Sequence, residues 1–108
     1  MKVFISFIFL FGFVLNIYAK TNSVDCLILE DENSIVCKYI HTRVSYEKKV
    51  TVQWIEPDGS ITRTREMIIP AYHGSIYDYR YIHGRTKGEW TFKVIDDNKE
   101  YTTTFVLE

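Results

Sequence analysis

The sequence predicts an all-β domain of about seven short strands. Apolar and polar residues alternate with a period of two, which is typical of strands that bury one face. Turn-forming residues recur roughly every 8–12 residues, and no 3.6-residue helical period appears after residue 20. Residues 20–108 are therefore expected to form a single antiparallel β-sandwich of the immunoglobulin-like or fibronectin type III-like class.

The expected strands follow one another along the chain with short connections. They cover residues 24–29, 35–43, 50–55, 61–69, 75–83, 90–95 and 101–107. Between the third and fourth strands lies Pro57-Asp58-Gly59, in which proline presets φ and glycine accepts a positive φ. A turn at Asp97-Asn98 predicts a hairpin between the last two strands.

Residues 1–19 have the layout of a secretory signal peptide. A basic start at Lys2 precedes an apolar run over residues 3–17, and Ala19 is a small residue at the expected cleavage site. The alternative, an uncleaved anchor, is disfavoured because the run is shorter than the ~20 residues of a spanning helix. We expect cleavage after Ala19, a periplasmic or secreted protein, and no stable membrane insertion of residues 20–108.

The two cysteines lie on the two strands of the first predicted hairpin, one on each. A loop at residues 30–33 places Leu29 opposite Ser34 and, three pairs further along, Cys26 opposite Cys37. Directly opposed cysteines suit a disulfide, and such bonds persist in the oxidising compartments to which a signal peptide leads. The alternative is two buried free thiols.

The later strands divide cleanly into two faces. The last hairpin is expected to pair Trp90 with Phe105 and Val94 with Tyr101, which places the large apolar residues on one side. By contrast, residues 61–69 carry charges at mid-strand. Such charges discourage pairing with another chain and therefore predict an edge strand.

The fifth predicted strand alternates tyrosine with charge. Tyr77, Tyr79 and Tyr81 occupy every second position, and Asp78 and Arg80 lie between them. Because Asp and Arg are rarely buried, we expect the three tyrosines to face the core. A separate set of tyrosines is expected to be exposed: Tyr39, Tyr46 and Tyr72.

Composition and motifs give little support for catalysis. Lys and Arg number 13 against 14 Asp and Glu, so electrostatics gives no case for nucleic-acid binding. Neither a Gly-x-Ser-x-Gly elbow nor a sequence-local set of metal ligands occurs. We expect no catalytic residue, metal or cofactor. The candidate interaction surface comprises Asp78, Arg80, His83, Arg85, Arg63 and Arg65.

Two stretches carry a resemblance to a known class of module. Residues 54–59 read Trp-Ile-Glu-Pro-Asp-Gly, residues 88–94 read Gly-Glu-Trp-Thr-Phe-Lys-Val, and Phe105-Val106 follows near the end. This pattern resembles small immunoglobulin-like or fibronectin type III-like modules of bacterial envelope proteins, some of them in a family of unassigned function. The resemblance covers roughly residues 50–107. It implies a fold and no particular ligand.

These observations favour a non-catalytic secreted or periplasmic protein-interaction module. We expect it to act as a subunit, scaffold or adaptor of an envelope complex, with a separate protein chain as partner. Strand addition at the edge formed by residues 61–69 is one expected mode of contact. The alternative is a small ligand- or carbohydrate-binding module that uses exposed aromatic residues. An enzyme is the least supported class.

Overall fold

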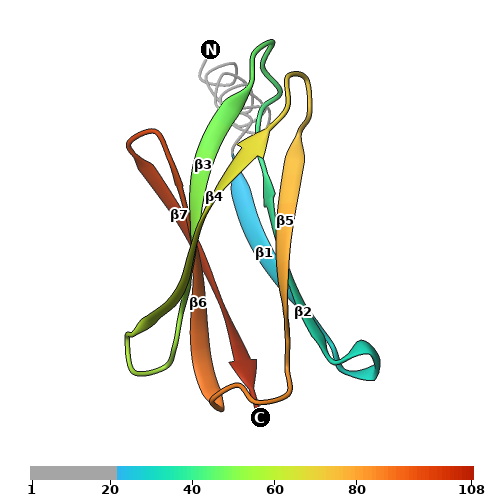
Figure 1. The fold of residues 1–108 in the computed structure, drawn as a ribbon, viewed down its shortest axis with the longest axis vertical. Helices are drawn as coiled ribbons and strands as arrows, with labels where there is room; N and C mark the ends of the chain where they lie inside the picture. The colour runs from blue at the N-terminus through green and yellow to red at the C-terminus, as the bar shows by residue number, and fades with distance from the viewer. Residues whose placement is uncertain (1–21) are drawn as a thin grey trace, which may run out of the picture.

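The computed structural model describes residues 22–108, which form a β-sandwich and confirm the predicted fold class (Figure 1). The predicted signal peptide lies outside the described residues. The strands are β1 (Ser23–Leu29), β2 (Ser34–Ile40), β3 (Lys48–Ile55), β4 (Ile61–Ile69), β5 (Ser75–Tyr81), β6 (Gly88–Asp96) and β7 (Lys99–Leu107). A short 3-10 turn, η1 (Glu30–Glu32), links β1 to β2. Over residues 22–108, no helix has the length and apolar character needed to cross a bilayer.

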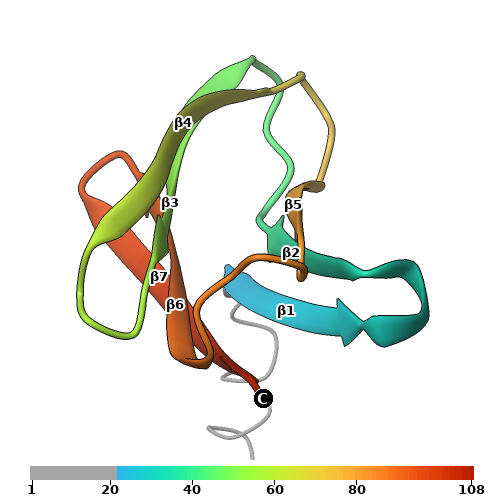
Figure 2. The ribbon, with the colours of Figure 1, turned by 60° about the horizontal axis from the view of Figure 1, so that its bottom comes forward.

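The strands form two antiparallel sheets, and each sheet has a free edge on the same side of the sandwich. One sheet has the order β1-β2-β5 and the other the order β4-β3-β6-β7. On one side β1 lies against β6 and β7, whereas on the other side the backbones of the edge strands β4 and β5 stand apart; this side of the sandwich is here called the opening (Figures 1 and 2). The expected edge position of residues 61–69 is therefore confirmed.

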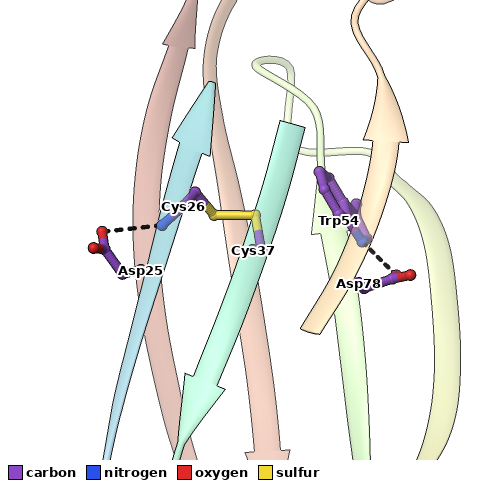
Figure 3. Close-up of a disulfide and its surroundings, with 5 residues drawn as sticks. All are labelled: Asp25, Cys26, Cys37, Trp54 and Asp78. Atoms are coloured by element: carbon purple, nitrogen blue, oxygen red, sulfur yellow. Dashed lines mark hydrogen bonds between the residues drawn. A yellow bond between two sulfur atoms is a disulfide. The ribbon is translucent and has the colours of Figure 1, made fainter. Parts of the chain in front are cut away.

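The predicted hairpin registers are also confirmed. In the β1–β2 hairpin Cys26 lies opposite Cys37, and a disulfide joins them (Figure 3). In the β6–β7 hairpin Trp90 lies opposite Phe105. The disulfide fits a location outside the cytoplasm, because thiols in the cytosol are kept reduced.

The core lies between the sheets and is rich in aromatic residues. The indole of Trp54 packs edge-on against Phe92 and Phe105, with ring centroids 5.2 and 6.0 Å apart. The inward-facing residues of β3, β6 and β7 are buried, as the alternation of apolar and polar residues predicts. The buried apolar residues are Ile35, Cys37, Tyr39, Val50, Val52, Trp54, Ile69, Trp90, Phe92, Val94, Phe105 and Leu107.

The two motif stretches of the sequence meet at the base of the sandwich. Gly88, at the start of β6, has φ +126°, a conformation that residues with a side chain rarely adopt. A Cβ atom on Gly88 would also lie 2.9 Å from Cγ of Pro57 in the β3–β4 turn. Both the backbone conformation and the close approach of Pro57 therefore require glycine at this position.

The predicted orientation of β5 is wrong. Tyr77, Tyr79 and Tyr81 are 62%, 51% and 55% exposed, whereas Asp78 and Arg80 are 3% and 9% exposed. The strand thus turns its charged residues toward the inside of the sandwich and its tyrosines toward solvent. The physical reason lies in the partners that β3 and β4 supply to those charges.

Candidate binding site between β4 and β5

Asp78 is the centre of a buried polar cluster. Nε1 of Trp54 donates a hydrogen bond to its Oδ2 at 3.0 Å (Figure 3). From β4, Nη1 of Arg65 lies 2.6 Å from Oδ1, and Nη1 of Arg63 lies 3.2 Å from both oxygens. A carboxylate can be buried when charged donors surround it in this way. These donors explain why Asp78 faces inward.

Arg80 lies beside Asp78 on the inner face of β5 but makes few polar contacts. Its Nη1 donates to the hydroxyl of Thr62 at 3.0 Å, and its Cζ lies 5.5 Å from the centroid of the Trp54 ring. Its buried Nε atom has no hydrogen-bond partner. Burial, together with the charges of Arg85 and Arg63, lowers the pKa of the Arg80 guanidinium. The surroundings therefore leave this cation poorly compensated.

Asp78, Arg80 and the neighbouring arginines line a pocket at the opening, here called the arginine pocket. Its volume is about 240 Å³. Two arginines also bond the backbone of β5: Nε of Arg85 donates to the Tyr81 carbonyl at 3.0 Å, and Nη1 of Arg63 donates to that of Tyr79 at 3.4 Å. The lining residues are Arg63, Arg65, Asp78, Tyr79, Arg80, Tyr81 and Arg85. A small pocket of this charge is suited to an anion.

The exposed face of β5 forms a second feature, here called the tyrosine strip and defined as Tyr77, Tyr79 and Tyr81. In the sheet register Tyr79 lies beside Val36, which in turn lies beside Leu27, a residue 59% exposed. The strip therefore continues into an apolar row across the outer face of the three-stranded sheet. Because Tyr79 and Tyr81 also line the arginine pocket, the two features adjoin.

The strip does not present a flat stacking platform. The rings of Tyr79 and Tyr81 have centroids 6.0 Å apart, and their planes meet at 79°. The two tryptophans cannot replace them, because Trp54 is 0% and Trp90 2% exposed. Stacking on a sugar ring requires exposed aromatic faces, and two adjacent rings at this angle do not form one common surface.

The other predicted site residues are not part of the pocket. Tyr39, expected to be exposed, is buried, and its hydroxyl donates to Oδ2 of Asp96 at 2.6 Å. Tyr46 and Tyr72 are exposed, as expected, but lie in loops and not on β5. His83 is exposed in the loop after β5, where its backbone N–H donates to the side chain of Asn33. The prediction for Tyr39 fails because its hydroxyl finds a buried acceptor on β6.

The sequence did contain a signal for the arginine pocket. Arg63 and Arg65 are two residues apart in β4, as are Asp78 and Arg80 in β5, so each pair lies on one face of its strand. Two facing edge strands can place the arginines of one against the aspartate of the other. What the sequence lacked was the information that these two edges lie on the same side of the sandwich.

A second buried carboxylate, Asp96, has partners within the fold. Oδ1 pairs with Nζ of Lys48 at 2.8 Å, and Oδ2 accepts the hydroxyl of Tyr39. Burial pushes the pKa of Asp96 upward, but Lys48 and Tyr39 outweigh it and hold the pKa below its usual value of 3.8. Burial also raises the pKa of Tyr39, which keeps its hydroxyl protonated as a donor.

This cluster predicts a specific dependence of stability on pH. Because the pKa of Asp96 is lower in the folded state, its contribution is present above pH ~4 and is lost as the pH falls through the folded value. Asp96→Asn is expected to lower the free energy of unfolding at pH 7 by about 1.5–3 kcal/mol. Urea unfolding at pH 7 and at pH ~2.5 measures the difference, which should shrink at the lower pH.

The neighbouring Asp97→Asn is the matched control, since the side chain of Asp97 is 83% exposed. It should change stability little at either pH. A deficit of Asp96→Asn that stays the same at both pH values would contradict the assignment.

Comparison with known proteins adds no assignment to these features. Neither a protein-family model nor a curated protein matches the chain. Among residues 22–108, no group of three or more His, Cys, Asp or Glu side chains is placed to hold a metal ion.

Proposed function

We propose that this protein is a non-catalytic interaction module of the periplasm or extracellular space. It binds a separate protein chain and serves as a subunit, scaffold or adaptor of an envelope complex. The proposed contact surface is the tyrosine strip on the outer face of β5, with the adjoining rim of the arginine pocket.

The observation that carries this proposal is the exposure of three large aromatic side chains in a row. Each residue of the tyrosine strip is more than half exposed, so three large side chains remain in contact with solvent. Tyrosine and arginine are enriched at the centres of protein interfaces, because a large, rigid ring or a planar cation makes strong contacts there. Exposed Leu27, in the row that crosses Tyr79, extends the apolar surface beyond the strip.

The geometry favours protein contact over sugar stacking. Perpendicular rings and buried tryptophans do not suit a planar saccharide, whereas a protein surface can fit between rings of different orientation. The free edge of β4 remains a second route of contact by strand addition.

The proposal predicts that the tyrosine strip is needed for partner capture and not for stability. In a triple variant, Tyr77→Thr, Tyr79→Thr and Tyr81→Thr, threonine keeps a high strand propensity, so the free energy of unfolding should change by only about 1 kcal/mol. The tagged protein, purified from its native host and analysed by mass spectrometry, should lose a partner that the unaltered protein retains.

A double variant, Tyr46→Thr with Tyr72→Asn, provides the matched control, because Tyr72 has φ +68°, which asparagine tolerates and a β-branched residue does not. It also removes exposed tyrosines, but at positions outside the strip. It should retain the partner, and the purified partner should rebind this control and not the strip variant. Equal capture by both variants would overturn the assignment of the strip as the contact surface.

A further inference from the structure

The arginine pocket holds more positive charge than the fold itself uses. Four guanidinium groups line it, and Asp78 is the only carboxylate among the lining residues. Glu56 lies near enough to favour the charged form of Arg80 but does not line the pocket. Even with Glu56 included, four cations face two anions. Nearby charges of one sign repel, so such an excess costs stability unless an anion joins them.

Arg80 is the group that most needs an additional partner. It is only 9% exposed, and its Nε hydrogen has no acceptor. A buried N–H group without a hydrogen bond destabilises the folded state, and a charged one more so. Asp78 favours the charged form of Arg80 but makes no hydrogen bond to it, because the oxygens of Asp78 accept from Trp54, Arg63 and Arg65. An anion bound in the pocket, which Arg80 lines, would offset the charge of this cation.

We infer that the arginine pocket is a carboxylate-binding site, which receives an acidic side chain or the terminal carboxylate of the partner protein. This inference rests on the proposed function, because it names the group that the partner presents beside the tyrosine strip. A planar guanidinium matches the two oxygens of a carboxylate. Arg63 and Arg65 already hold the carboxylate of Asp78 at the inner end of the pocket, each through its Nη1 atom.

Size and overall charge argue for a single carboxylate over an extended polyanion. A volume of about 240 Å³ accommodates a single acidic group and is small for a larger ligand. Besides Asp78 and the four arginines, only Tyr79 and Tyr81 line the pocket, and the chain as a whole has a net charge of −1. A long polyanion needs a continuous basic stripe to neutralise successive charges, and the tyrosine strip does not supply one.

Nuclear magnetic resonance of the ¹⁵N-labelled protein tests the inference directly. The probes are N-acetyl-glutamic acid α-amide, its glutamine counterpart, N-acetyl-leucine and inorganic phosphate, all at one constant ionic strength. The glutamic acid probe should shift the Nε–H signal of Arg80 saturably, and its glutamine counterpart should not. N-acetyl-leucine reports whether a terminal carboxylate binds as well as a side-chain one, and the stronger of the two identifies the source.

Variants at the rim avoid the risk that a change at buried Arg80 unfolds the protein. Arg85→Gln should raise the Kd of the better carboxylate probe about tenfold, the usual effect of losing one charge-assisted hydrogen bond. Arg43→Gln is the matched control, since Arg43 likewise donates to a tyrosine carbonyl, that of Tyr72, but lies outside the pocket. It should leave the Kd unchanged.

Three results would overturn the inference: no shift at Arg80 with either carboxylate, equal weakening by Arg85→Gln and Arg43→Gln, or binding of phosphate as tight as that of the carboxylates. These results are separable from a failure of the proposed function. If the pocket binds no carboxylate but the strip variant still loses its partner, only the pocket assignment falls. If a carboxylate binds and the strip variant retains its partner, the strip assignment falls and the pocket stands.

Discussion

Replacing Asp78 with alanine is expected to lower the free energy of unfolding by about 2–4 kcal/mol. The buried groups Trp54 and Arg80 lose their acceptor or nearby counter-charge, whereas the side chains of Arg63 and Arg65 are 33% and 48% exposed and can turn to water. The change leaves the indole N–H of Trp54 without its acceptor and places Arg63 and Arg65 beside Arg80 with no intervening anion. For a domain of this size the total stability is about 5–10 kcal/mol, so much of it would be lost. Urea unfolding followed by tryptophan fluorescence measures the change.

Two comparison variants separate the buried charge from general effects. Asp25→Ala removes an exposed carboxylate from the outer face of the same sheet and should cost far less. Asp78→Asn keeps an oxygen that can accept from Trp54, so its cost should fall between the two. If Asp78→Ala were no more destabilising than Asp25→Ala, the cluster would not be a stabilising element.

Removing the disulfide is the second change with a large expected effect. A variant with both Cys26→Ala and Cys37→Ala should lose about 2–3 kcal/mol, since the bond closes a short loop and restricts the unfolded chain. Alanine is preferable to serine here because Cys37 is 0% exposed, and a serine hydroxyl would be buried in the core. The midpoint of urea unfolding should fall accordingly.

Reductant provides the internal control for this prediction. The unaltered protein should shift toward the midpoint of the double variant when a reductant is added, and the double variant should not respond. A thiol-labelling reagent checks that reduction is complete. If the thiols are fully labelled and the unfolding midpoint of the unaltered protein still does not change with reductant, the disulfide contributes no stability.

The sequence alone determined most of the architecture, because the relevant signals are local. Alternation along β3, β6 and β7 defined their buried faces, and turn residues at Pro57-Asp58-Gly59 and Asp97-Asn98 located two hairpins. In a hairpin the loop length sets the register, so the pairing of Cys26 with Cys37 followed from counting residues. None of these features depends on how the two sheets pack against each other.

The tertiary structure decided which face of β5 is buried, because that depends on groups distant in sequence. Alternation showed that Tyr79 and Asp78 point in opposite directions, but it could not show which of them points inward. The general rarity of buried charge favoured the tyrosines, and this was wrong because Trp54, Arg63 and Arg65 supply donors across the opening. For Tyr39 the same reason applies, since its buried acceptor is on β6. The energy of burying a polar group is set by its partners, and only the folded arrangement reveals them.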